Sequence, residues 1–221
     1  EMSIRVIGLG AGGHAKGLIE ILQLNLQYEL VGLLDRDNST VGQKVLEVPI
    51  IGDDSLMDTL VRNGVSHFFV GLGSAGKQGP RVRVYEFARS YDLTAVSIIH
   101  PSAIVSPSAK LGAGITLLAG SIVNAAAQLG ENVIVNSGAI VEHDCQIEEH
   151  VHIATGAKLA GMVHVRRGTH IGAGAVIRQG ITVGQNVIVG LGAVVVHDVE
   201  DNVTVVGVPA RPMKKTEHGH D

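Results

Sequence analysis

The chain has 221 residues, which is enough for two modest domains that each bury a core of their own. A formal net charge of -4 and an aromatic content of only 3% exclude a basic or base-stacking surface for nucleic acid. The single cysteine, Cys145, excludes an internal disulfide framework, and with no long apolar stretch or signal peptide we expect a cytoplasmic protein with no membrane partner.

Residues 1–99 have the pattern of alternating strands and helices. Short apolar runs predict strands at 4–10, 29–35, 67–73 and 95–99. Apolar residues at helical spacing predict helices at 15–25, 55–64 and 79–91. This order predicts a small Rossmann-like α/β domain, in which helices cover a parallel sheet.

The first predicted strand runs directly into a glycine-rich turn. Gly8, Gly10 and Gly13 match G-x-G-x-x-G in the context that this motif needs, after a strand and at the start of a helix. Asp35 ends the second strand, where an acidic residue usually takes a ribose hydroxyl. The motif is typical of NAD sites, but residues 1–99 have room for roughly half of a full dinucleotide fold. We therefore favour a nucleotide-sugar ligand.

Residues 100–213 follow a six-residue rule. Every sixth residue from Val105 to Val195 is Val, Ile or Leu without exception, and the position two residues earlier is small or Val in nearly every case. A period of six matches neither a helix nor a strand, but it suits a three-sided coil with aliphatic side chains stacked inside. The alternative, a run of antiparallel hairpins, needs turn signals every 8 to 12 residues, and those are missing. Residues 214–221 form a polar tail.

A cluster of polar residues, Glu142, His143 and Asp144, interrupts this repeat. His143 lies two residues past the inward-facing Val141, so we expect it to point outward near a corner of the coil. A lone histidine there is most often a solvated surface residue, but Asp144 can hold one ring nitrogen and make the other a general base. Gly161 lies one turn further on, where we expect it to leave open space and a free backbone N–H.

These segments also carry a family resemblance. The stretches 129–145 (LGENVIVNSGAIVEHDC), 156–165 (GAKLAGMVHV) and 205–213 (VVGVPARPM), together with 8–17 (GLGAGGHAKG), resemble left-handed parallel β-helix acyltransferases. Along nearly the whole chain, the sequence is similar to those that acetylate nucleotide-linked amino sugars or sialic acid. The resemblance implies a homotrimer with active sites between subunits and acetyl-CoA as co-substrate. It also implies direct acetyl transfer, with His143 as the catalytic base supported by Asp144.

Further site residues follow from the same resemblance. Asn136 would orient the base or the substrate, although asparagine also fills corners of such coils by bonding the backbone. His152 and Gly161 would line the acetyl-CoA groove between neighbouring coils, and the Gly161 N–H would stabilise the oxyanion. The nucleotide would be held by Gly12, Gly13, His14, Asp35, Arg36 and the turn at Gly71. Arg36 stands where some relatives have a second acidic residue, which leaves the nucleobase open.

The sequence leaves several alternatives open. Cys145 is two residues from His143, but it occupies the small inward column, so we interpret it as core. The coil also occurs in γ-class carbonic anhydrases, whose zinc site needs histidines two turns apart and a further histidine five residues on. Counted from His143, these positions hold Pro107 and Glu148, so we expect no metal. The runner-up activity is O-acetylation of sialic acid. A non-catalytic scaffold that binds a nucleotide-sugar is the alternative of another class.

Overall fold

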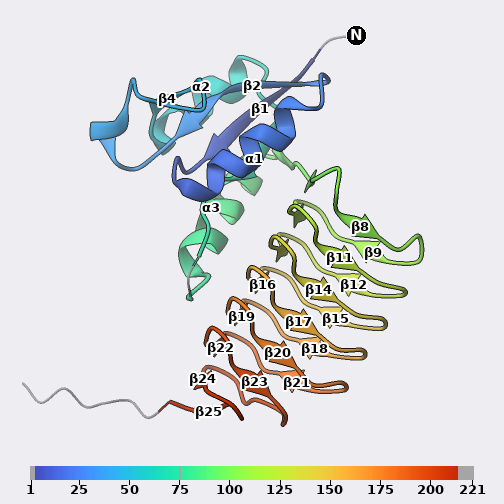
Figure 1. The fold of residues 1–221 in the computed structure, drawn as a ribbon. Coiled ribbons are helices and arrows are strands. Elements are labelled where there is room, and N and C mark those ends of the chain that lie inside the picture. The colour runs from blue at the N-terminus through green and yellow to red at the C-terminus, as the bar shows by residue number, and fades with distance from the viewer. Residues whose placement is uncertain (1–2, 75, 214–221) are drawn as a thin grey trace, which may run out of the picture.

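The computed structural model describes residues 3–74 and 76–213, so the predicted polar tail 214–221 lies outside the described residues. An α/β domain at the amino end packs against one side of a long coil of short strands (Figure 1). The predicted order of an α/β part followed by a coil is confirmed.

The amino-terminal sheet has the strand order β3-β4-β2-β1-β5-β6 and is parallel except for the β3–β4 hairpin. Helix α1 buries Leu18 and Leu22 on one face, whereas α2 and α3 bury Met57 and Ala88 on the other. The sheet is therefore covered on both sides, as the alternating pattern predicts. The elements are β1 (Ile4–Leu9), α1 (Gly13–Gln23), β2 (Tyr28–Leu34), η1 (Asn38–Thr40), β3 (Lys44–Val45), β4 (Val48–Gly52), η2 (Asp54–Leu56), α2 (Met57–Arg62), β5 (His67–Val70), α3 (Gly79–Arg89) and β6 (Thr94–Ala95).

Two features of this domain differ from the sequence prediction. The expected strand 95–99 is divided, because Ala95 pairs with β5 of the domain whereas Ile98 and Ile99 already pair with the coil. The β3–β4 hairpin was not expected. Its turn residues, Leu46 and Glu47, have φ angles of 47° and 66°, a conformation that Asn and Gly usually signal.

The coil consists of three parallel sheets that run its length, one on each side. Sheet I contains β7 (Ile98–Ile99), β10 (Thr116–Leu117), β13 (Ile134–Val135), β16 (His152–Ile153), β19 (His170–Ile171), β22 (Ile188–Val189), β24 (Thr204–Val206) and the antiparallel β25 (Arg211–Pro212). Sheet II contains β8 (Ile104–Val105), β11 (Ile122–Val123), β14 (Ile140–Val141), β17 (Lys158–Leu159), β20 (Val176–Ile177) and β23 (Val194–Val195). Sheet III contains β9 (Lys110–Leu111), β12 (Gln128–Leu129), β15 (Gln146–Ile147), β18 (His164–Val165) and β21 (Thr182–Val183).

The second residue of each two-residue strand is the aliphatic one that the six-residue rule marks. From Leu117 to Val195 these side chains are almost completely buried and form one continuous core. Backbone hydrogen bonds join each turn to the next, as between the Ile134 N–H and the Val151 carbonyl at 3.0 Å. Each buried Val, Leu or Ile contributes roughly 1.5–3 kcal/mol, so the stack of aliphatic side chains holds the coil together.

The outward side of sheet I is covered by the amino-terminal domain. Ile134, His152 and His170 point away from the core, yet all three are buried. From the domain side, Arg81 donates a hydrogen bond to the Asn132 carbonyl at 2.6 Å, and Tyr85 donates to Glu131 at 2.8 Å. Polar contacts from α3 therefore fix the domain on sheet I.

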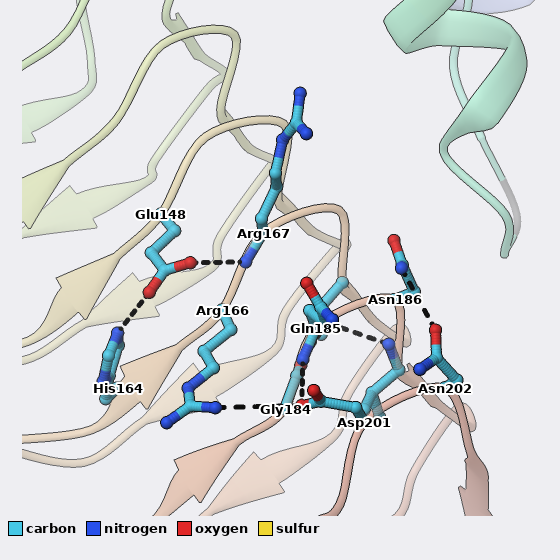
Figure 2. Close-up of polar contacts among 11 residues, drawn as sticks. Glu148, His164, Arg166, Arg167, Gly184, Gln185, Asn186, Asp201 and Asn202 are labelled. Atoms are coloured by element: carbon cyan, nitrogen blue, oxygen red, sulfur yellow. Dashed lines mark hydrogen bonds and ion pairs between the residues drawn. The ribbon is translucent and has the colours of Figure 1, made fainter.

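Sheet III carries polar side chains on its outward side. Figure 2 shows Glu148, whose carboxylate lies 2.8 Å from His164 Nε2 and accepts the Arg167 N–H at 2.9 Å. About three turns further along, Asp201 accepts the Gln185 N–H at 3.0 Å and lies 3.9 Å from the Arg166 guanidinium. Since these polar groups find partners within the chain, this face suits contact with water.

Candidate active site

His143 and Asp144 form a close pair at the corner between sheets II and III. His143 Nδ1 lies 2.8 Å from Asp144 Oδ2, and both side chains are about half exposed. Asp144 reaches back because its backbone has a φ of 59°, the left-handed turn conformation. When Nδ1–H donates to this carboxylate, Nε2 keeps its lone pair and can accept a proton. The Glu142 carboxylate accepts the His143 backbone N–H at 3.2 Å and so contacts the backbone rather than the ring.

Gly161 does not leave open space beside His143, and this expectation was wrong. The imidazole packs against the glycine, so that a Cβ at Gly161 would be 2.5 Å from Nε2 and 2.6 Å from Cε1. The glycine is required because the ring fills the position of the missing side chain. Within residues 3–74 and 76–213, no group accepts a hydrogen bond from the Gly161 N–H. This donor therefore belongs to the residue that the imidazole packs against.

Asn136 is held at a different corner of the coil. It follows β13 of sheet I, whereas His143 follows β14 of sheet II. Asn136 Oδ1 accepts the Ser137 N–H at 2.8 Å, and its Nδ2 lies 3.3 Å from His152 Nε2. The structure therefore brings Asn136 together with His152, and it places both apart from the His143 and Gly161 corner of the same chain.

Histidines are buried where the amino-terminal domain meets sheet I. His152 stacks edge to face on His170 with ring centroids 4.9 Å apart, and its Nδ1 lies 3.4 Å from Ser74 Oγ of the domain. Burial lowers the pKa of His152 to about 3 and that of His14, from the glycine loop, to about 4. These rings are therefore neutral at pH 7. The burial of these rings could not be predicted, because nothing in the repeat indicates which side of the coil the domain covers.

The glycine loop has the shape that a phosphate site needs. Gly12 caps helix α1, and Cβ atoms at Gly12 or Gly13 would meet nothing within 4 Å, so the approach to the helix N-terminus is open. A side chain at Gly71 would collide with the Gly10 carbonyl, which explains glycine in the neighbouring turn. Asp35 accepts the Ala11 N–H at 2.8 Å and thereby fixes the loop.

Cys145 is part of the core, as its place in the inward column predicts. Its side chain is fully buried, and Sγ donates to the Ala160 carbonyl at 3.2 Å. Burial raises the pKa of the thiol to about 11, so the thiolate needed for nucleophilic attack is not formed at neutral pH. The described residues contain no group of three or more His, Cys, Asp or Glu that could hold a metal ion. No helix in the same residues is long and apolar enough to cross a membrane.

Comparisons with known proteins agree with these two parts of the chain. Residues 5–83 match the model of the PglD N-terminal domain, and residues 126–161 match that of the bacterial transferase hexapeptide, six repeats. No curated protein sequence matched in a separate comparison.

Solved structures match along nearly the full length. One is PerB from Caulobacter crescentus in complex with CoA and GDP-perosamine, which is 38% identical, with a TM-score of 0.87 over 95% of this chain and 97% of that one. Two variants of the same enzyme, with alanine or asparagine in place of one histidine, match equally. The acetyltransferase domain of PglB from Neisseria gonorrhoeae, in complex with acetyl coenzyme A, is 37% identical, with a TM-score of 0.87 over 96% of this chain and 100% of that one. The chain therefore belongs to the bacterial hexapeptide-repeat sugar acetyltransferases with a PglD-type amino-terminal domain, built on a left-handed parallel β-helix.

Proposed function

We propose that the chain transfers the acetyl group of acetyl-CoA directly to the amino group of a nucleotide-linked 4-amino-6-deoxy sugar, with His143 as general base. The observation that carries this proposal is the His143–Asp144 pair, held 2.8 Å apart and packed against Gly161, whose N–H has no acceptor among the described residues. The relatives support the choice of substrates, since one binds CoA with GDP-perosamine and another binds acetyl coenzyme A.

The reaction follows from the chemistry of these groups. The sugar amine attacks the thioester carbonyl, and His143 Nε2 takes the proton that the nitrogen loses as the C–N bond forms. The carbonyl oxygen becomes an oxyanion, which the Gly161 N–H stabilises. When the C–S bond breaks, the imidazolium returns the proton to the sulfur of CoA. Asp144 stabilises the imidazolium between these two steps, and no acyl-enzyme forms.

We further propose that each active site is completed by a second copy of the chain. The His143 corner joins sheets II and III, so it lies across the coil from sheet I, on which the amino-terminal domain packs. One copy therefore cannot bring its own glycine loop to its own His143. A neighbouring copy can bring its glycine loop there if its corner between sheets I and II meets the His143 corner. Asn136 and His152 lie at that corner, next to the domain.

The outward side of sheet II supports such contacts. Its outward column is apolar apart from Lys158, and two of its members, Ile104 and Val176, are 61% and 39% exposed. An apolar column of this length is unusual on a surface that faces water. We therefore place sheet II between copies in a closed homotrimer. Ile140→Arg in sheet II should give monomers without activity, whereas Gln146→Arg in the polar sheet III should leave both unchanged, as measured by light scattering and CoA release.

The remaining roles complete the proposal. Residues 1–99 bind the nucleotide and residues 100–213 carry out acyl transfer. Asn136 orients the substrate, and His152 and Gly161 line the acetyl-CoA groove. The nucleotide-binding positions are Gly12, Gly13, His14, Asp35, Arg36 and Gly71.

The test is release of CoA from acetyl-CoA with a panel of UDP-, GDP- and dTDP-linked amino sugars and free sialic acid, for the wild type and His143→Ala. Turnover of an amino sugar, reduced at least a hundredfold in the variant, is the expected result. Turnover of sialic acid alone would favour the O-acetyltransferase. Binding of a nucleotide-sugar without any turnover would favour the scaffold and contradict the role of His143.

A further inference from the structure

A small cavity lies at the carboxyl ends of β1, β2 and β5, next to the glycine loop. Its volume is about 150 Å³, less than the roughly 300–1,000 Å³ that a whole drug-sized ligand fills.

 Ligands of open α/β sheets bind at this edge, outside the carboxyl ends of the strands. The cavity therefore has room for one part of a nucleotide, such as its base.

The walls and the rim of this cavity differ in chemistry. Apolar side chains form the walls, and a carboxylate and a guanidinium stand at the rim. The lining residues are Leu9, Gly10, Leu34, Asp35, Arg36, Asp54, Leu72, Pro80 and Val84. A flat ring with a polar edge matches this arrangement, because its faces can pack on the apolar walls while its edge meets the charged rim.

The charged rim is an ion pair between Arg36 and Asp54. Both Nε and Nη2 of Arg36 lie 3.4 Å from Asp54 Oδ2, and no other described group bonds the second carboxylate oxygen. Asp54 is two-thirds buried, and it is held in a short turn that begins where Asp53 accepts the Ser55 N–H at 3.0 Å. Arg36 is far more exposed, at 71%, so its guanidinium is free to turn toward a ligand.

We propose that this pair selects guanine, so that the sugar substrate is linked to GDP. The sugar part of this inference rests on the proposed function, whereas the choice of base rests on the cavity and its ion pair. The Watson–Crick edge of guanine offers two neighbouring donors, N1–H and the 2-amino group, next to the acceptor O6. A carboxylate accepts from both donors at once, and an adjacent guanidinium donates to O6.

Other bases match the pair less well. Uracil has one donor, N3–H, between two carbonyl oxygens, so the second carboxylate oxygen of Asp54 would face a carbonyl rather than a donor. Adenine and cytosine present a ring nitrogen acceptor where guanine has N1–H, which leaves the carboxylate against a lone pair. Arg36, the residue that departs from the acidic position of some relatives, thereby becomes part of the selection.

The test is calorimetric binding of GDP, IDP and UDP to the intact chain, since IDP differs from GDP only in lacking the 2-amino group. We expect GDP to bind at least tenfold more tightly than IDP or UDP. Asp54→Asn should remove the preference for GDP over IDP, because an amide presents a donor to the base. Asp58→Asn, an exposed carboxylate in the first turn of α2, is the matched control and should keep the preference.

Equal binding of GDP and UDP, or an unchanged preference for GDP over IDP in Asp54→Asn, would overturn the inference. These measurements need neither acetyl-CoA nor turnover. Failure of the base assignment can therefore be told from failure of the proposed function, which would appear as the absence of CoA release with every amino sugar while nucleotide binding is intact.

Discussion

The contact between Gly161 and the His143 ring makes Gly161→Ala the most informative single substitution. A Cβ would lie 2.5 Å from Nε2, about 1 Å inside an ordinary contact distance of roughly 3.5 Å. Gly161 is outside the left-handed region of φ, so the new methyl group strains no backbone angle. His143 is half exposed and can rotate toward solvent, so the ring, rather than the coil, should move.

A displacement of about 1 Å at a catalytic group can cost about a hundredfold in rate, which corresponds to about 2.7 kcal/mol. We therefore expect kcat to fall about a hundredfold while the melting temperature stays within about 2 °C of the wild type. The assay is CoA release at saturating substrates, with thermal unfolding of the same samples.

Gly192→Ala provides the opposite pattern as a control. Gly192 has a φ of 65° with open space around its Cβ position, so alanine there should cost about 1–2 kcal/mol of stability and leave kcat unchanged. If Gly161→Ala keeps a kcat within threefold of the wild type, the position of the His143 ring does not limit the reaction and the assignment of the base fails.

Three further results are expected. Asp144→Asn should lower kcat roughly 10–100-fold in the CoA-release assay, because the amide cannot stabilise the imidazolium; a rate within threefold of the wild type would remove Asp144 from the mechanism. Cys145→Ala should keep kcat within about threefold, since the thiol is buried with a raised pKa, and a loss above a hundredfold would point to an acyl-enzyme. The lowered pKa values of His14 and His152 mean that the unfolded chain binds more protons below about pH 6.5, so stability should fall as the pH drops from 6.5 toward 4. Urea unfolding at pH 7 and pH 5 measures this slope, which His152→Gln should reduce and exposed His197→Gln should not; equal slopes in all three proteins would contradict it.

The six-residue period was sufficient to predict the coil, because each aliphatic residue of the repeat occupies the same inward place in every turn. The same register predicted that Cys145 is core and that His143 points outward. Asp144 could be paired with His143 because the two are adjacent in sequence. The hairpin turn at Leu46 and Glu47 could not be predicted, since neither residue favours a positive φ.

The composition of the site depended on information that the repeat does not contain. His143 lies seven positions after Asn136, which is one hexapeptide plus one residue. The two residues therefore occupy neighbouring corners of the coil rather than the same corner. Which corner faces the nucleotide depends on the side of the coil that the domain covers. That side is set by contacts of α3, such as Arg81 with the Asn132 carbonyl, between residues far apart in sequence. The histidines at this contact are neutral because the same packing of the domain buries them.

The most direct test of an active site shared between copies is complementation between two inactive variants. His143→Ala removes the base, and Gly12→Asp places a carboxylate where the phosphates are proposed to bind, so each variant alone should release no CoA above background. Mixed trimers from co-expression can contain a site with the intact His143 corner of one copy and the intact glycine loop of its neighbour. Our account predicts that activity returns, to no more than about a third of the wild-type rate per trimer. Co-purified mixed trimers without activity would contradict the shared site.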